Sequence, residues 1–506
     1  MDVARIKRSG QLLHATNSTS KTSKAARSTP KSTNGTTNPF IIITTPSAKI
    51  DPAARKQIRS HVMRGKNRKR VDPSRNTTLG SWINHGCQVP LSREVAVETA
   101  ALIHSSIPGR LGTDISHIQL VDEVDPYRAK LVHTWFTTLK TTMYPIETVV
   151  RPPMDQWFEY IAYDRAYLNC VLFATQAFID WARDQKISRS SFEHLNLAMT
   201  NLRQSLATAS QAPSDSTMAV VVTLTLMSDV LQDHDAGRKH IEGLYHLVQM
   251  RGGIRTLQDN PQLQIKVLRA DLGHAISTGS KPLFFSEGFS WDPYLAPHSK
   301  VPTYSPAFRR TVQNLLSASR EIPDQRLINV YLDLQEFSLA TNLAYQTGNK
   351  IAFEPFLETL VSAQYRLLAL QTEHLENRLT TLLILGLITF TTTAFLQVRG
   401  MPMQYEDLTR QLRERLVTFD QQFEDDEKEE LTRYKLWFLF MAAISVVTDP
   451  ADEHLLLGAA SALLARIGMT GAPWNDIRGV LREHMWVDML HSAYGKEFYE
   501  KVQLLA

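Results

Sequence analysis

Apolar residues recur at spacings of three and four along most of the chain from about residue 91 onward. This is the pattern of helices that bury one face, and few stretches show the alternation typical of strands. Pro and Gly gather between the periodic segments. The pattern predicts an all-α fold with these helices: Glu94–His104, Asp155–Arg183, Phe192–Ala209, Met218–Leu231, Arg238–Met250, Asp324–Tyr345, Ala352–His374, Arg378–Val398, Leu408–Phe423, Leu431–Val447, Glu453–Ile467 and Trp474–Tyr494.

One apolar run has to be distinguished from a membrane span. Thr380–Leu396 has 17 residues without a charge, which is a little short for a span, and six of them are threonines. Its neighbours are amphipathic helices of the soluble type. We therefore expect a buried core helix and no membrane partner.

The stretch 279–306 is the longest loop-like insertion between the predicted helices. It carries five aromatic residues between Phe284 and Tyr294. A loop with so many apolar side chains is expected to pack on the helical body or to line a cleft.

The charge of the chain is divided between its two ends. Residues 1–75 contain 17 Lys and Arg against 3 Asp, a net charge of +14, whereas the remainder has a net charge of −10. Residues 1–38 are rich in Ser, Thr, Lys and Asn and have no apolar period, which predicts a disordered tail. We expect a basic arm at 39–75 and a multi-helix body at 76–506.

The basic arm contains a predicted short helix with Asp51 as N-cap and Pro52 at its first position. Basic residues follow along this helix and continue into the tract Lys66–Arg70. A cluster of this kind is typical of a nuclear-import signal that an import receptor binds, and it is also compatible with contacts to DNA phosphates or with a solvated face. The import reading predicts a nuclear protein. The candidate residues for import or phosphate contact are Arg55, Lys56, Arg59, Arg64, Lys66, Arg68, Lys69 and Arg70.

The two cysteines, Cys87 and Cys170, exclude a disulfide framework and a four-thiolate zinc site. The first fifteen residues have no apolar run, so we expect no secretory signal. The sequence contains no phosphate-binding glycine loop, no nucleophile elbow and no H-E-x-x-H pair. We therefore expect no enzyme, no catalytic residue, no metal and no cofactor.

The segment His240–Gly253, HIEGLYHLVQMRGG, has a straightforward structural interpretation. Ile241, Leu244, Leu247 and Val248 predict one apolar helix face. Gly252 and Gly253 suit a left-handed cap at the end of that helix, and Arg251 would complement its dipole. Contact with a ligand is the alternative.

Two polar clusters could be sites or ordinary structure. His484, Asp488 and His491 share one face of the predicted helix Trp474–Tyr494, a spacing that could bind a metal but that also arises in a helix packed through Trp486 and Leu490. The second cluster is expected to be a solvated helix end, and its members are Asp229, Asp233, His234 and Asp235.

Three segments, in order along the chain, resemble the fungal-specific transcription-factor family. The first, FIIITTPSAKIDPAARKQIRSHVMRGKNRKR, is similar to a variant branch in which a basic RSHVMR stretch replaces the zinc cluster. The second is the motif with His240, Gly243, Arg251, Gly252 and Gly253. The third is the C-terminal run with Trp437, Trp474, Trp486, Asp488, His491 and Gly495.

The resemblance implies an all-α regulatory domain, nuclear residence and control of transcription, in many members of a metabolic or secondary-metabolite gene set. It also implies other transcription factors, or a second copy of the chain, as partners. The family's binuclear zinc cluster needs six clustered cysteines, which this chain lacks. A helical ligand-binding protein or an enzyme without a recognisable catalytic motif is the alternative.

Overall fold

The computed structural model describes residues 119–139, 143, 146, 148–149, 156–184, 186–208, 212–285, 290–293, 295, 315, 324–349, 351–374, 378–397, 403–417, 429–446 and 449–505. All of them belong to one of the chain's two units, Leu79–Ala506. Outside the described residues lie the tail 1–38, the basic arm 39–75 with all eight candidate residues from Arg55 to Arg70, and the helix expected over Glu94–His104.

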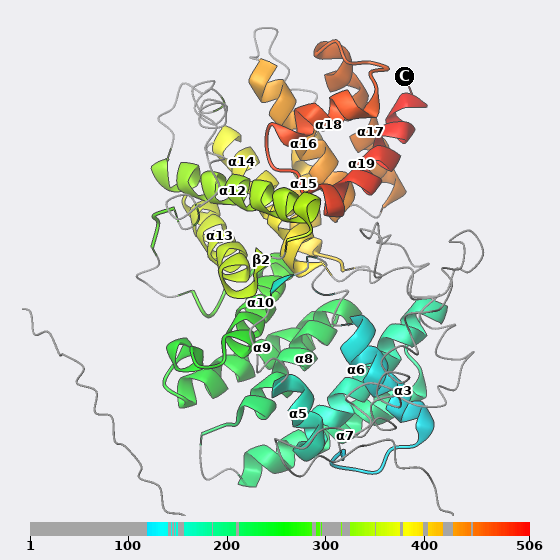
Figure 1. Ribbon diagram of the computed structural model, residues 1–506, viewed down its shortest axis with the longest axis vertical. Helices are drawn as coiled ribbons and strands as arrows, with labels where there is room; N and C mark the ends of the chain where they lie inside the picture. The colour runs from blue at the N-terminus through cyan, green and yellow to red at the C-terminus, as the bar shows by residue number, and fades with distance from the viewer. Residues whose placement is uncertain are drawn as a thin grey trace, which may run out of the picture. The chain divides into compact units, whose positions relative to one another are not determined.

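The described part of the chain is all-α, as the periodicity predicts (Figure 1). A short parallel pairing joins β1 (Thr148–Val149) to β2 (Ile351–Ala352). The helices are α3 (Pro126–Thr134), η3 (Trp135–Leu139), α5 (Gln156–Tyr163), α6 (Arg165–Asp184), α7 (Arg189–Thr208), α8 (Asp215–Leu231), α9 (His234–Met250), η4 (Ile254–Leu257), α10 (Pro261–Thr278), α12 (Gln325–Thr347), α13 (Phe353–Glu373), α14 (Arg378–Thr391), η5 (Thr392–Leu396), α15 (Glu406–Val417), α16 (Glu429–Ser445), α17 (Pro450–Arg466), α18 (Trp474–Arg482) and α19 (Asp488–Gln503).

The helices α3 to α10 form a first group in which neighbours along the chain pack together, α6 on α7 and α8 on α9. Side chains before α8, α9 and α10 accept the backbone N–H groups that a helix start leaves unpaired: Ser214 from Thr217 at 3.1 Å, Asp233 from Ala236 at 3.0 Å, and Asn260 from Leu263 at 3.2 Å. The sequence thus marks these starts with ordinary capping residues.

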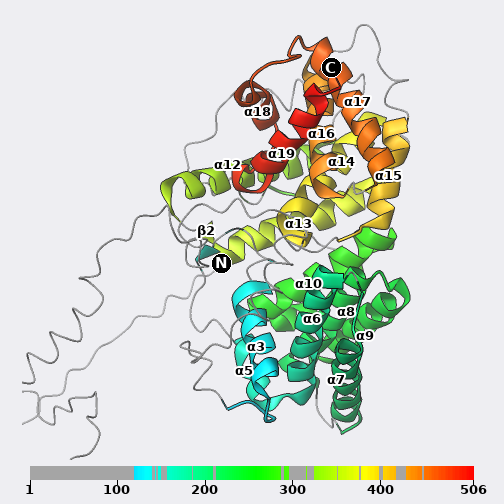
Figure 2. The same ribbon diagram turned by 90° about the vertical axis from the view of Figure 1, so that its right-hand side faces the viewer.

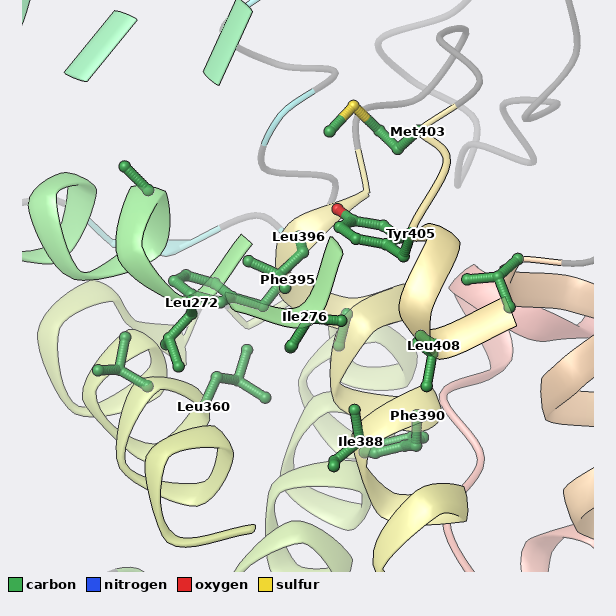
Figure 3. Close-up of a cluster of buried hydrophobic side chains, with 14 of the residues drawn as sticks. Leu272, Ile276, Leu360, Ile388, Phe390, Phe395, Leu396, Met403, Tyr405 and Leu408 are labelled. Atoms are coloured by element: carbon green, nitrogen blue, oxygen red, sulfur yellow. The ribbon is translucent and has the colours of Figure 1, made fainter. Parts of the chain in front are cut away.

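The helices α12 to α19 form a second group, and α10 packs against both groups (Figure 2). It contacts α8 and α9 in the first group and α13 and α15 in the second. Figure 3 shows this contact, where Leu272 and Ile276 of α10 lie among Leu360, Phe395 and Leu408.

The apolar run Thr380–Leu396 forms α14 and η5, and its side chains are buried in the second group, which confirms the prediction of a core helix. It is long and apolar enough to span a membrane, but 89% of its most apolar window is buried inside the protein. Several of the threonine hydroxyls donate to carbonyl groups of their own helix, for example Thr389 to Leu385 at 2.7 Å and Thr392 to Ile388 at 2.8 Å. These hydroxyls therefore find acceptors within the apolar helix itself.

The first group differs from the sequence prediction at several helices, and α3 is one that no predicted helix covers. The segment predicted as one helix, Asp155–Arg183, is broken at Asp164, whose carboxylate caps α6 by accepting the N–H of Tyr167 at 3.0 Å. Helix α10 was not among the predicted helices, because it is buried on most of its sides and its apolar residues form no single stripe.

A buried ion pair joins α12 to α13. Asp333 and Arg366 are both 0% exposed, and the guanidinium Nη2 donates to Asp333 Oδ2 at 2.7 Å. The arginine also donates to the carbonyl of Ser362, and Asp333 Oδ1 accepts the N–H of Leu295 at 2.9 Å. The pair therefore has several hydrogen bonds to offset its desolvation.

We predict that Arg366→Met destabilises the protein by about 3–5 kcal/mol, because it leaves the Asp333 carboxylate buried without a counter-charge. Urea unfolding followed by circular dichroism measures the change. As a control, Lys496→Met removes an exposed pair with Glu500 and should cost less than about 1 kcal/mol. Equal losses in the two variants would contradict the prediction.

Candidate functional site

The motif segment His240–Gly253 forms the second half of α9 and the turn after it. Ile241, Leu244, Leu247 and Val248 are buried, which confirms the predicted apolar face. His240 is half-buried, and burial lowers its pKa. Nothing lies within 4 Å of the position that a side chain on Gly243 would take.

Two glycines end α9. Gly252 and Gly253 have φ angles of 98° and 97°, in the region that favours glycine, as the sequence predicts. The N–H of Gly253 donates to the carbonyl of Val248 at 3.0 Å, which closes the helix end. The turn therefore depends on glycine for its conformation.

Arg251 pairs with the carboxylate of Asp215 at the start of α8, a specific contact that the sequence prediction of a dipole interaction did not include. Asp215 also accepts a hydrogen bond from the side-chain amide of Asn260 at 2.8 Å, and Asn260 caps α10. The Arg-Gly-Gly turn thus ties the end of α9 to the starts of α8 and α10.

The tryptophans and His491 of the C-terminal motif lie in one cluster of rings between α14, α16, α18 and α19, and all of them except the partly buried Trp474 are buried. The centroid of the Trp486 ring is 6.2 Å from that of Trp474 and 5.2 Å from that of His491. Phe390 of α14 lies 6.4 Å from Trp437 and 5.7 Å from His491. We refer to these five rings, with Tyr434, Phe440, His484 and Phe498, as the ring cluster.

The predicted helix Trp474–Tyr494 is wrong, because the chain turns between Arg482, where α18 ends, and Asp488, where α19 begins. His484 therefore lies in the turn and does not share a helix face with Asp488 and His491. Arg482 pairs with Asp488 across the turn. In the described ranges, no three possible metal ligands come together.

Both ring nitrogens of His491 are engaged. Its Nδ1 accepts the N–H of Val487 at 3.0 Å, so the ring proton is on Nε2, which lies 2.8 Å from the hydroxyl of Thr393. His484 uses Nδ1 for the hydroxyl of Tyr331 at 2.9 Å. These histidines hold the turn in place against η5 and α12.

Polar residues of α12 bind the backbone of this turn, and sequence reasoning did not identify them. The Asn342 amide donates to the carbonyl of Trp486 at 2.6 Å and accepts the N–H of Asp488 at 2.8 Å. Ser338 accepts the N–H of Trp486 at 3.0 Å. A polar residue on the inner face of an amphipathic helix was the only sequence signal for these contacts.

The described part of the aromatic insertion is attached to the body, which confirms that it packs there. Asp271 of α10 accepts the backbone N–H groups of Leu283 and Phe284 at 2.8 and 2.9 Å, and the hydroxyl of Tyr365 at 2.8 Å. Phe285 stacks on Tyr365 at 5.8 Å. If Leu283 and Phe284 moved away from the body as a lid, two hydrogen bonds to a buried carboxylate would break.

Asp229 is buried, so the prediction of a solvated cluster is wrong for this residue. Its Oδ1 lies 3.4 Å from Nδ1 of His274 on α10, and Gly237 leaves space for this contact because a side chain there would lie 3.2 Å from the imidazole. Burial raises the pKa of Asp229. Asp233 and Asp235 are exposed, as predicted.

Two buried oxygens near this pair have no hydrogen-bond partner: Oδ2 of Asp229 and the hydroxyl of Tyr405. Burial raises the pKa of the Tyr405 hydroxyl, and the opposing effects of the Arg269 and Asp229 charges on it are smaller. Figure 3 shows Tyr405 near Leu396 and Met403. Unpartnered buried oxygens mark a place where water or a small polar ligand could bind.

Comparisons of the chain with protein-family models, with curated proteins and with solved structures found no match. The resemblance drawn from the three sequence segments therefore stays a prediction.

We predict that Gly495→Ala destabilises the protein by about 1–3 kcal/mol, although alanine favours helices. A Cβ atom on Gly495 would lie 2.7 Å from Cη2 of Trp486 and 3.0 Å from Cη2 of Trp474. The matched control is Gly458→Ala on the exposed side of α17, where nothing lies within 4 Å and a gain of up to about 1 kcal/mol is expected. Thermal unfolding measures both, and effects of the same sign would refute the packing argument.

We predict that His484 contributes to acid lability. Burial lowers its pKa to about 3, whereas an unfolded histidine titrates near 6.5. Between these two pKa values the unfolded chain binds a proton at His484 and the folded chain does not. The contribution of the buried, neutral His484 to stability is therefore complete above pH 6.5 and is lost as the pH falls toward 3. His484→Gln keeps a hydrogen-bonding group for Tyr331, and its melting temperature should fall less steeply between pH 7 and 4. Parallel curves would exclude this role.

Proposed function

We propose that the chain is a nuclear transcriptional regulator whose helical body binds partners or an effector. The observation that carries the proposal is the division of charge, with a net +14 in residues 1–75 and −10 in the rest. A basic segment can bind an anionic partner or an import receptor. The acidic body itself would repel an anionic partner.

The three segments that resemble fungal-specific transcription factors support the same function. Within the second and third segments, the described residues have roles in folding: the Arg251 turn joins three helix ends, and Trp486 and His491 belong to the ring cluster. Such roles fit a regulatory domain whose family motifs are structural elements and not parts of a catalytic centre.

The main role of the basic arm would be nuclear import, and contact with DNA would be its secondary role. Lys66–Arg70 has four cations in five residues, and an import receptor needs only such an exposed cluster. Contacts of Arg55, Lys56, Arg59 and Arg64 with phosphates would be nonspecific and strongly salt-dependent. The two cysteines cannot form a zinc cluster, which excludes zinc-dependent reading, and we propose that sequence-specific reading comes from partner transcription factors.

A helical ligand-binding protein is the second candidate, and one observation favours it. Oδ2 of Asp229 and the hydroxyl of Tyr405 are buried without partners at the junction of α8, α10 and α15. A ligand there would have to donate to the carboxylate and fit beside Gly237 and Gly273. The hydrogen bonds of Leu283 and Phe284 to Asp271 argue against a movable lid over this site that includes these two residues.

We predict that deletion of residues 55–70 moves a fluorescent fusion of the full chain from the nucleus to the cytoplasm. Replacing Lys66, Arg68, Lys69 and Arg70 with alanine should have the same effect, because the import receptor would lose its charged contacts. Quantitative imaging of the nuclear-to-cytoplasmic ratio measures the change.

The matched control replaces Lys21, Lys24 and Arg27 in the tail, which removes a similar charge outside the arm and should leave the ratio unchanged. Unchanged nuclear accumulation of the deletion variant would contradict the import role of residues 55–70. A cytoplasmic location of the unaltered chain would overturn the proposed function itself.

A further inference from the structure

A buried carboxylate oxygen of α8 faces a small space beside Gly273 of α10. Asp229 is 2% exposed, and its Oδ2 has no hydrogen-bond partner among the described residues. A Cβ atom on Gly273 would lie 3.6 Å from this oxygen. Apart from the chain neighbours and helix backbone of Gly273, no other described atom would lie within 4 Å of that Cβ atom. The space is therefore open toward the oxygen that lacks a partner.

The second oxygen of the carboxylate already has a neighbour. Oδ1 of Asp229 lies 3.4 Å from Nδ1 of His274, which follows Gly273 directly in α10. This contact holds the carboxylate in one orientation and leaves Oδ2 on the side of Gly273.

The hydroxyl of Tyr405 is another buried group without a hydrogen-bond partner among the described residues. Tyr405 is 1% exposed and stands directly before α15. A tyrosine hydroxyl can donate and accept, whereas an ionised carboxylate such as that of Asp229 only accepts. Each of these groups is costly to bury without a partner, and one small molecule that bonds to both would remove the two costs together.

Contacts beside Tyr405 bring it to the part of α10 that contains Gly273. The hydroxyl of Ser277 donates to the carbonyl of Gln404 at 3.4 Å, and Ser277 stands one helical turn after Gly273 on the same face of α10. The charge of Asp229 also acts on the pKa of the Tyr405 hydroxyl. Figure 3 shows Tyr405 beside α10, in agreement with the packing of α10 on α15.

We propose that a single water molecule binds beside Gly273, where it donates to Oδ2 of Asp229 and is hydrogen-bonded to the hydroxyl of Tyr405. A buried water needs a space of about one water-sized sphere and about two to four polar partners. The space beside Gly273 is that of one side-chain carbon, which suits a single oxygen atom.

This water joins the two groups of helices. Asp229 belongs to α8 in the first group, Tyr405 precedes α15 in the second, and α10 packs against both. The inference goes beyond the regulatory function and does not depend on it. A ligand of the second candidate function would have to displace this water.

Gly273→Ala tests the water through the sign of its effect. The added methyl group expels the water and leaves Oδ2 of Asp229 without a partner, so the melting temperature of the full chain should fall by about 1–4 °C. In an unoccupied space the same methyl group would raise the melting temperature, because alanine favours helices. The matched control is Gly243→Ala in α9, where no described atom lies within 4 Å of the new Cβ atom and the melting temperature should rise.

Tyr405→Phe tests the second partner of the water. Loss of a hydroxyl that binds water should lower the melting temperature, whereas loss of a buried hydroxyl without a partner should raise it. In a chain that already carries Gly273→Ala the water is gone, so Tyr405→Phe should then raise the melting temperature. Circular dichroism checks the fold of each variant, and Tyr405→Phe alone decides the question if Gly273→Ala does not fold.

Three results would overturn the inference: a rise in melting temperature for Gly273→Ala, a rise for Tyr405→Phe in the otherwise unaltered chain, or equal effects of Tyr405→Phe with and without Gly273→Ala. Native mass spectrometry of the full chain separates water from a larger occupant. A stoichiometric adduct that disappears in Gly273→Ala would also contradict the inference, because a larger ligand would then hold the site.

Discussion

Helix α10 places charged and polar side chains inside the protein, and both helix groups supply the hydrogen-bond partners that these side chains need. Arg269 donates to the carbonyls of Met143 and Leu396, at 3.1 and 3.2 Å, and so reaches both groups. Asp271 accepts three hydrogen bonds, and His274 lies against Asp229. Because a buried polar group is costly without a partner, each of these contacts fixes the position of a neighbouring element.

The same rule explains how irregular segments are held. The insertion after α10 has no regular structure in its described part, yet buried carboxylates accept N–H groups of its backbone, and Asn329 donates to the carbonyl of Trp291 at 2.9 Å. The turn before α19 is bound in the same way by Asn342 and Ser338. Loops of this protein are thus positioned by side chains of distant helices, and the helices are positioned by their apolar faces.

The sequence predicts poorly how loops are positioned, because that depends on distant side chains. It predicts well which helices have an apolar face. Amphipathic helices such as α9 follow from spacing, because Ile241, Leu244 and Val248 mark one face. Helix α10 escaped prediction because burial on most sides removes the single stripe. The turn at 483–487 and the burial of Asp229 depend on Asn342 and His274, which are distant in the chain, so no local pattern contains them. The sequence shows the basic arm only as a concentration of positive charge.

The contact between α12 and the last turn has a consequence for synthesis. Tyr331 and His484 are 153 positions apart, and Thr393 and His491 are 98 apart. A ribosome completes α12 and the apolar helix α14 well before the residues that close the ring cluster exist. The first group consists mainly of neighbouring helices and can fold during this interval, and α14 can already pack on α13. The side of α14 that contacts α16 and the ring cluster stays uncovered until those later residues have been made.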